Sequence, residues 1–414
     1  MKNFGRITMA CAAGAIALGV VGTKDASAGE SDGNAWTAAQ LNTYSCNQGD
    51  YGAAGSYFAN VMGNGTYRRQ STYTCLESDT SNAASAVVTS LETLRAATAQ
   101  TVGIIAQRIS NVRNASSAKS PTFGFLTRDK GEIGLAGGDK KRGIGVWVQG
   151  SYTNVDNDAS AGAYDGDIYT GMVGIDKEIN SKVLVGLALG YEGTDIDTAF
   201  NSGGIESDGF IVSPYLAINI AKIGGVDVSA DATAGWAHLN YEANRKDSIT
   251  SSTYNSDFDA NRYWGSVNLN ANMAVNEKLN VGLNAGLIHT NERKDDYTEL
   301  TTENLAFNAD QVKVEEQTTR LTQVRFGVGA SYKVNPMVTP FLDVTAGYDA
   351  NKSRVADVAS NQTALANDDW GVTIGGGVNL NIMPNLKARV EGSTVQGRDD
   401  WQEYTGMATV RYEF

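Results

Sequence analysis

The sequence predicts an all-β fold, a 12-stranded antiparallel transmembrane β-barrel that is preceded by an α-helix. Three observations predict this fold. From Ile144 to the end of the chain, apolar and polar residues alternate with period 2, in runs longer than the about 5–6 residues of an ordinary strand. Short connections alternate strictly with long polar ones, as in a barrel built from hairpins. Ahead of these runs, residues 81–113 show the period of a helix.

Residues 1–28 have the pattern of a secretory signal peptide. Lys2 and Arg6 give a positively charged start, and residues 9–22 are apolar but too short to span a bilayer. Ala26-Ser27-Ala28 is a small-x-small cleavage site. We therefore expect the mature chain to begin at Gly29, in an oxidising compartment.

Residues 29–80 form a short polar segment with few apolar side chains. Cys46 and Cys75 remain after removal of the signal peptide, and such a pair is most simply a disulfide in a secreted protein. The bridge would close a loop of about 30 residues, worth roughly 3–4 kcal/mol in the chain-entropy model. Two interpretations stay open: a small module stapled by the disulfide, and a disordered tail with a loose bridge.

Residues 81–113 are predicted to form an amphipathic helix of about 50 Å. Arg95 and Arg108 lie on its polar face, and a coiled coil remains an alternative because the spacing is close to a heptad. Residues 114–143 follow as a linker that begins with a Ser-rich stretch before Pro121. The apolar face of the helix consists of Val87, Leu91, Leu94, Val102, Ile105, Ile109 and Val112.

Residues 144–414 are predicted to form the barrel itself. The alternation is clearest in 278–291, where Leu279, Val281 and Leu283 alternate with polar residues or glycine. The twelve runs are 144–154, 168–178, 182–194, 206–220, 226–242, 258–274, 278–291, 317–334, 338–351, 369–382, 386–397 and 401–414.

The connections predict which barrel end faces which side of the membrane. The five short connections contain turn residues and are predicted to be periplasmic turns. Because the number of strands is even, the first strand begins and the last strand ends on this same periplasmic side. The long ones are rich in Asp, Asn, Ser and Thr and are predicted to be outer loops: 155–167, 195–205, 243–257, 292–316 and 352–368.

Tyr and Trp residues gather near the strand ends, where we expect their rings at the membrane–water interface. The 46 Gly and 18 Tyr fit a barrel, and the formal charge of −13 argues against nucleic acid as a partner. The residues placed in this belt are Trp147, Tyr152, Tyr169, Tyr191, Tyr215, Trp236, Tyr263, Tyr332, Tyr348, Trp370, Trp401 and Tyr412.

The last run, Trp401 to Phe414, places apolar residues at every second position up to the final residue. Val410, Tyr412 and Phe414 lie on this apolar face. The ending resembles the C-terminal signature of Gram-negative outer-membrane proteins, and this resemblance implies recognition by the barrel-assembly machinery.

A helix, a linker and twelve strands with an aromatic end resemble the classical (type V) autotransporters. The helix end 108–113 looks like the stretch that precedes those barrels. Residues 134–139 and 145–150 look like the entry into their first strand, and 173–176 and 185–191 look like their second and third strands. The resemblance covers about residues 81–414.

This resemblance implies a translocator barrel in the cell outer membrane that exports or displays residues 29–80, a short passenger-like segment, at the cell surface. It implies that the helix remains threaded in the lumen and that the partners are outer-membrane lipid and the assembly machinery, with a monomeric protein. The alternatives are a simple outer-membrane pore and a surface adhesin for a host or cell-surface ligand.

The sequence departs from the family in two ways. Only about 50 residues without repeats precede the helix, so no known passenger activity is assigned to them. A disulfide-bridged loop must also fit through the pore. Some members cut themselves at an Asn pair in the helix; Asn111 and Asn114 are not adjacent, so we predict no such cleavage.

No enzymatic activity is predicted. The chain has two His, His238 and His289, and lacks HExxH, GxSxG and CxxC patterns. A barrel-strand hydrolase site and a Ca²⁺ site in 292–316 are the alternatives, but the acidic spacing there matches no EF-hand. We expect neither a cofactor nor a metal.

Overall fold

The computed structural model describes residues 90–116, 144–159, 162–180, 182–246, 252–301, 311–314, 316–353, 368–383 and 385–413. The predictions for residues 1–89, which include Cys46, Cys75 and Val87, lie outside these ranges, as do those for the linker 117–143 and for Phe414. The division into five domains therefore stays a prediction. The predicted helix is present as α4, which the structure places at Ser90–Ser116.

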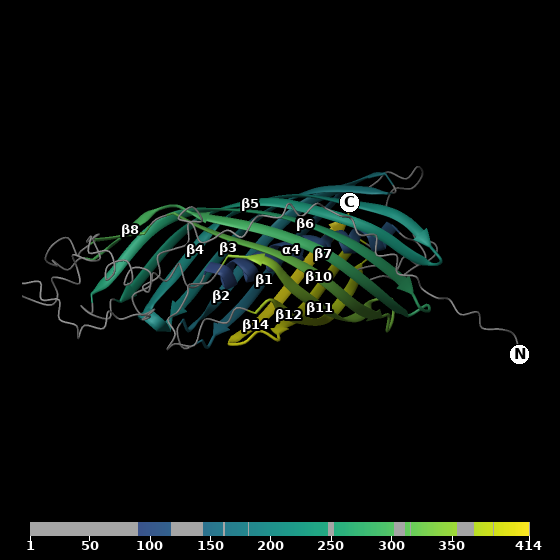
Figure 1. Ribbon diagram of the computed structural model, residues 1–414. Helices are drawn as coiled ribbons and strands as arrows, with labels where there is room; N and C mark the ends of the chain where they lie inside the picture. Colours follow the sequence, from purple (N-terminus) through teal and green to yellow (C-terminus); the bar gives the residue numbers. More distant parts are fainter. Residues whose placement is uncertain are drawn as a thin grey trace, which may run out of the picture. The chain divides into compact units, whose positions relative to one another are not determined.

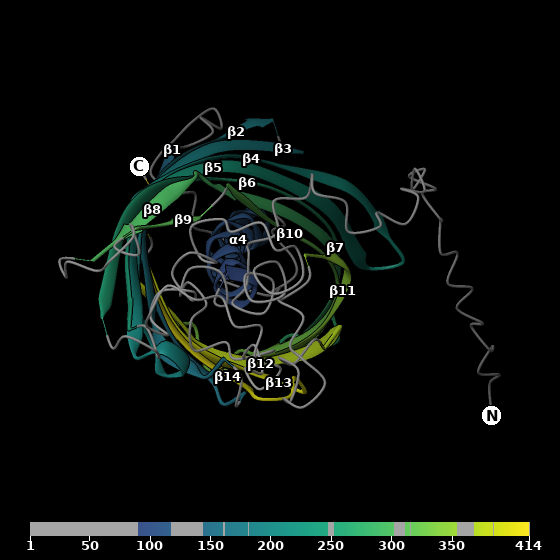
Figure 2. The same cartoon turned by 60° about the vertical axis from the view of Figure 1, so that its left-hand side comes forward.

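Twelve long strands close into an antiparallel barrel, which confirms the predicted fold (Figures 1 and 2). The sheet order is β5-β4-β3-β2-β1-β14-β13-β12-β11-β10-β7-β6, and pairing of β5 with β6 closes the ring. The long strands are β1 (Ile144–Asn157), β2 (Tyr164–Asn180), β3 (Val183–Thr198), β4 (Gly203–Ile223), β5 (Val226–Lys246), β6 (Thr253–Ala274), β7 (Leu279–Lys294), β10 (Gln317–Tyr332), β11 (Val338–Lys352), β12 (Trp370–Met383), β13 (Leu386–Gln396) and β14 (Trp401–Glu413).

The strands β1–β7 extend further at their long-loop ends than the sequence predicted, so the predicted loop limits there were wrong. Only the turn η2 (Ala199–Asn201) and Ser202 separate β3 from β4. The predicted loop 292–316 contains a hairpin of β8 (Tyr297–Leu300) and β9 (Gln311–Val314). The sequence analysis placed these strand ends in loops because their outward residues are polar. Their inward positions still alternate, since Ile196 and Ile205 are buried.

Asparagine side chains fix the register at three of the short turns. The Oδ1 atoms of Asn180, Asn276 and Asn335 each accept hydrogen bonds from the backbone N–H groups two and three residues later, at 2.8–2.9 Å. Such an Asx turn links two strands with few residues. A one-residue slip would move every side chain of a strand to the other face, so these turns help to keep the apolar face outward.

The outward face carries an aliphatic belt. Val410, Val148, Val173 and Leu189 are cross-strand neighbours on β14, β1, β2 and β3, and each is 50–52% exposed. Such a face is costly in water and suits the hydrocarbon of a bilayer. Within the described ranges, no helix is long and apolar enough to cross a membrane.

Toward the long-loop end, the outward face of β2–β6 becomes acidic. Five carboxylates follow each other in direct cross-strand register, and like charges directly opposite each other are destabilising. This change from aliphatic to charged residues on single strands marks the level at which the wall leaves the lipid. The five are Asp167, Asp195, Glu206, Glu242 and Asp257.

Most of the predicted interfacial aromatic residues do face outward, for example Tyr152, Tyr263 and Trp370, which are 50–55% exposed. Trp147, Tyr215 and Trp401 were assigned wrongly to this belt. Their side chains point into the barrel and are 1%, 4% and 6% exposed. Aromatic residues near strand ends can face either side of the wall, and their position along the strand does not tell the two apart.

Candidate functional site: the lumen of the barrel

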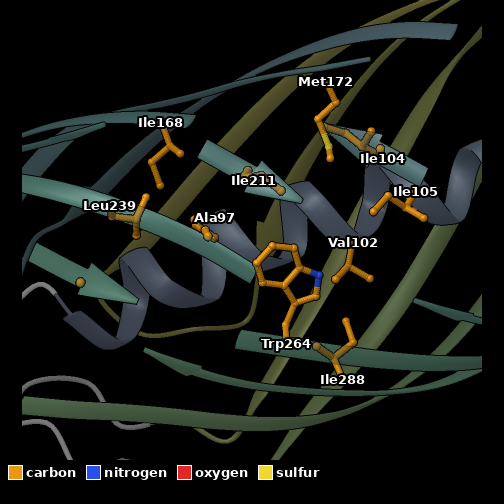
Figure 3. Close-up of a cluster of buried hydrophobic side chains, with 14 of the residues drawn as sticks. Ala97, Val102, Ile104, Ile105, Ile168, Met172, Ile211, Leu239, Trp264 and Ile288 are labelled. Atoms are coloured by element: carbon orange, nitrogen blue, oxygen red, sulfur yellow. The ribbon is translucent and has the colours of Figure 1, made fainter. Parts of the chain in front are cut away.

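The helix α4 lies inside the ring of strands (Figure 2). Its apolar side packs against inward residues of β2 and β4–β7, and Figure 3 shows Ala97, Val102, Ile104 and Ile105 among them. Full burial of an aliphatic side chain contributes about 1.5–3 kcal/mol. The wall residues of this cluster that Figure 3 labels are Ile168, Met172, Ile211, Leu239, Trp264 and Ile288.

The residues that the sequence analysis assigned to the helix lie as follows. Arg95 and Arg108 are 5% and 2% exposed, so the polar face is as enclosed as the apolar one. Val112 lies within α4, but its side chain is outside the described part. Val410 and Tyr412 lie on the outward face of β14, 51% and 41% exposed. The apolar residues Leu91, Leu94, Val102, Ile105 and Ile109 are all buried.

A buried ion pair anchors the C-terminal part of α4. Arg108 pairs with Asp176 of β2, four residues before the short turn that ends this strand. The Tyr215 hydroxyl donates to Asp176 Oδ2 at 2.9 Å, and Trp147 Nε1 donates to the Tyr215 oxygen at 3.0 Å. This Trp147–Tyr215–Asp176–Arg108 network satisfies a charge pair that would otherwise be costly to bury.

Glycines make space for the two rings of this network. A Cβ atom at Gly186 would lie 2.1 Å from Tyr215 Cζ, and one at Gly174 would lie 2.4 Å from Trp147 Cε2. Both rings thus lie flat on neighbouring strands where no side chain is present. The two glycines position the donors that hold Asp176 toward the helix.

We expect Gly186→Ala to destabilise the barrel by about 1–3 kcal/mol, because the methyl group forces Tyr215 off its position and weakens its bond to Asp176. Urea titration of the refolded protein in lipid vesicles measures this loss. Gly171→Ala is the matched control, since this outward glycine on β2 has nothing within 4 Å of the added carbon. Equal stability of the two variants would contradict the positioning role.

A second ion network holds the N-terminal part of α4. Arg95 Nη2 and Arg398 Nη2 both donate to Asp349 Oδ2, at 2.7 and 3.1 Å, and Gln323 Nε2 donates to Oδ1 at 2.8 Å. Asp349 lies three residues before the end of β11, where a long connection follows. The helix therefore runs from the long-loop end to the short-turn end.

Uncharged polar contacts fix the middle of the helix. Gln100 Nε2 donates to Thr153 Oγ1 at 3.0 Å, and Thr170 Oγ1 donates to Gln100 Oε1 at 2.6 Å. Gln107 donates to Glu391 of β13 and accepts, at its own Oε1 atom, a hydrogen bond from Gln149 Nε2 of β1 at 3.2 Å. These contacts bind the helix to β1, β2 and β13, which lie within a run of four neighbouring strands.

A third buried network braces the long-loop end. Arg262 of β6 donates to Glu192 Oε1 of β3 at 2.8 Å and to Glu292 Oε2 of β7 at 2.7 Å. Tyr241 donates to Glu292 Oε1 at 3.1 Å and stacks on Phe258. These wall residues were missed by the sequence analysis, although an inward charge on a membrane strand is itself a signal.

The two histidines occupy outward positions. His289 Nδ1 lies 2.8 Å from Thr322 Oγ1 and is exposed, while His238 is stacked on Trp236 and half-buried. Within the described ranges, no three His, Cys, Asp or Glu residues are placed to hold a metal ion. Neither histidine has a Ser and Asp arranged around it in the contacts that the structure shows.

Comparison with known proteins decides the family. A family model, autotransporter β-domain, matches residues 146–393, which is more than half of the chain. The chain belongs to the autotransporter β-domain family. In the comparison with curated proteins, no sequence matches this one.

Two solved structures have the same fold as this autotransporter β-domain. The translocator domain of the autotransporter NalP from Neisseria meningitidis aligns with a TM-score of 0.57 at 12% identity, over 78% of this chain and 98% of that one. The β-domain of the Bordetella autotransporter BrkA aligns with a TM-score of 0.52 at 17% identity, over 66% of this chain and 100% of that one.

The family and the geometry together make this protein an outer-membrane translocator barrel. Its aliphatic belt contacts lipid, and its fold is that of a transport barrel rather than of an enzyme. The lumen, with α4 and its two ion networks, is the candidate functional site.

Proposed function

We propose that the barrel exports residues 29–80 to the cell surface and keeps them attached there through α4. The direction of α4 carries this proposal. Arg95 binds beside the end of β11 that precedes a long connection, and Arg108 binds beside the short turn after β2. Because β1 also begins at the short-turn end, the chain enters the lumen at the outer mouth and leaves it at the periplasmic one.

The proposal includes several of the sequence predictions. Val410, Tyr412 and Phe414 form the recognition signal for the assembly machinery, and Cys46 and Cys75 form a disulfide in the exported segment. Pairing of β1 with β14 leaves no open sheet edge at that seam, which favours a monomer. Asn111 and Asn114 are not adjacent, so α4 stays joined to its N-terminal segment. We propose a transport role without catalysis.

Labelling on intact cells tests the export. After mild reduction, a membrane-impermeant maleimide is expected to label Cys46 and Cys75 on whole cells as completely as in lysates. Two variants calibrate the assay. In each, Cys46 and Cys75 are changed to Ser and one new cysteine is introduced on the barrel. Asp399→Cys, in the exposed β13–β14 turn, is expected to react on cells, and Lys278→Cys, in the β6–β7 turn, only in lysates.

The controls separate the two parts of the account. If Asp399→Cys is labelled on intact cells but Cys46 and Cys75 react only in lysates, export is disproved. The same result would still support insertion of the barrel in the outer membrane. Labelling of Lys278→Cys on intact cells would instead disprove the orientation.

A further inference from the structure

The outward face beyond the aliphatic belt differs between two sides of the barrel. On β2 and β4, a carboxylate is the first outward residue beyond the aromatic one, Asp167 after Tyr169 and Asp208 after Phe210. On β7 and β10, which are neighbours in the wall (Figure 1), three outward residues in succession carry no carboxylate. These six residues, here called the β7–β10 patch, are His289, Asn291, Arg293, Thr318, Arg320 and Thr322.

The two arginines of the patch are placed to act together. Arg320 lies directly opposite Asn291 in the register, and Arg293 is the next outward residue after Asn291. Residues in such a diagonal relation are about 7–8 Å apart, so both long side chains can reach one common group. A guanidinium group donates two parallel hydrogen bonds to phosphate oxygens, which makes phosphate an anion well suited to this pair.

The charge of the patch is accessible to a partner. Arg320 is exposed, and within the described residues no carboxylate pairs with its guanidinium group. Arg293 pairs with Glu316, but the two side chains are 59% and 42% exposed, and an exposed pair holds its members weakly. The neutral hydrogen-bond donors around the two arginines are Asn291, Thr318 and Thr322.

The position of the patch along the strands indicates its partner. Leu287 and Val324, which lie opposite each other, are the outward residues next to the patch on the side of the aliphatic belt. Asp295 and Glu316 follow the patch on its other side. A cationic patch between an aliphatic surface and an acidic one lies at the depth of the lipid head groups. A membrane lipid suits it better than a soluble anion, because its acyl chains contact the aliphatic surface while its phosphate binds the arginines.

We propose that the β7–β10 patch binds a membrane lipid with a phosphate-bearing head group, in the leaflet at the long-loop end of the barrel. Arg293 and Arg320 bind the phosphate, and Leu287 and Val324 contact the acyl chains. The acidic outward residues of β2–β4 repel the same head group, so this lipid gathers on one side of the barrel. The proposal depends on the lipid-facing wall and not on the export of residues 29–80.

Quenching by brominated lipids tests this preference in the full mature chain with Cys46 and Cys75 changed to Ser. A fluorophore is attached to Phe326→Cys on β10 or, as the matched control, to Leu189→Cys on β3. Phe326 and Leu189 are 57% and 50% exposed, and each lies six residues from the charged position on its strand, Arg320 or Asp195.

The vesicles consist of phosphatidylcholine with a small fixed fraction of a lipid brominated in the middle of its acyl chains. This lipid is either phosphatidic acid, whose head group is a phosphate, or phosphatidylcholine. Beside Phe326→Cys we expect brominated phosphatidic acid to bind at least about threefold more strongly than brominated phosphatidylcholine, because each arginine attracts the anionic head group. Beside Leu189→Cys we expect no such preference.

Removal of the charges tests the two arginines themselves. Arg320→Gln is expected to lower the preference beside Phe326→Cys by roughly half or more, and Arg293→Gln together with Arg320→Gln to abolish it. Lys246→Gln is the control, since it removes an exposed cation at the end of β5, outside the patch, and should change nothing. Heat-modifiable mobility on a gel verifies that each variant is a folded barrel.

Three results would overturn the proposal. The first is an equal preference for phosphatidic acid at both labelled positions, and the second is a preference that survives the loss of both arginines. The third is no preference beside Phe326→Cys together with binding of inorganic phosphate that Arg320→Gln abolishes, which would assign the patch to a soluble anion. These outcomes do not bear on surface labelling of Cys46 and Cys75.

Discussion

Arg108→Ala is expected to lower the free energy of unfolding by about 3–5 kcal/mol, because it leaves the Asp176 carboxylate buried without its counter-charge. The side chains of this pair are 2% and 3% exposed, so water cannot replace the lost guanidinium. The Tyr215 hydroxyl still donates to the carboxylate, but this neutral donor does not replace the charge of the guanidinium. Urea titration in lipid vesicles measures the loss, and limited proteolysis measures whether α4 has left the lumen.

Arg293→Ala is the matched control for this prediction. It removes the same side chain from an ion pair with Glu316 that is exposed, 59% and 42%, and such pairs contribute about 0–1 kcal/mol. A second variant, Arg108→Met with Asp176→Asn, removes both charges and keeps an acceptor for Tyr215, so it should recover most of the stability. An Arg108→Ala protein as stable as Arg293→Ala would show that the helix is not anchored by this pair.

Val173→Arg is expected to destabilise the inserted barrel by about 2–4 kcal/mol, the cost of a cationic side chain on the lipid face near the middle of the bilayer. Val173 is 50% exposed, and its cross-strand neighbours Val148 and Leu189 belong to the same aliphatic belt. If this face met water, an exposed Arg would cost almost nothing. Folding titrations into vesicles measure the difference.

Asp165→Arg provides the matched control on the same outward face of β2. Asp165 lies beyond the aromatic residues and is directly opposite Asp156 and Asp197, so the new Arg meets carboxylates rather than lipid. We expect no loss of stability, because like-charge contacts are replaced by attractive ones. A loss equal to that of Val173→Arg would contradict the assigned membrane level.

The barrel wall was predicted well from the sequence, because apolar residues recur at every second position of its strands. Val410, Val148 and Val173 alternate with inward polar residues. In a membrane barrel the outward side chains contact lipid and the inward ones face the lumen, so this alternation assigns each residue to one face. The ends of the strands could not be predicted. Beyond the lipid, the outward residues of the strands are acidic, as at Asp195 and Glu206. A strand with many acidic residues has the same composition as a loop, so composition did not show where the strands end.

The lumen was predictable only in outline. The period of α4 shows which residues are apolar, but it cannot show that Arg108 meets Asp176 or that Arg95 meets Asp349, 254 positions later in the chain. Those pairs depend on barrel closure and on the depth of the helix. Trp147 and Tyr215 were misplaced for a related reason: they look like interfacial aromatic residues, and only Gly174 and Gly186 opposite them mark them as inward rings.

The central claim, a closed wall with lipid outside and a polar lumen inside, is tested most directly at two adjacent residues of β14. A fluorophore on a cysteine at Val410 or at Thr409 is placed in vesicles whose lipids carry bromine on their acyl chains. We expect strong quenching at Val410, 51% exposed on the outward face, and little at Thr409, 6% exposed and directed inward. Equal weak quenching at both positions, with Val410 quenched by aqueous iodide instead, would contradict the claim.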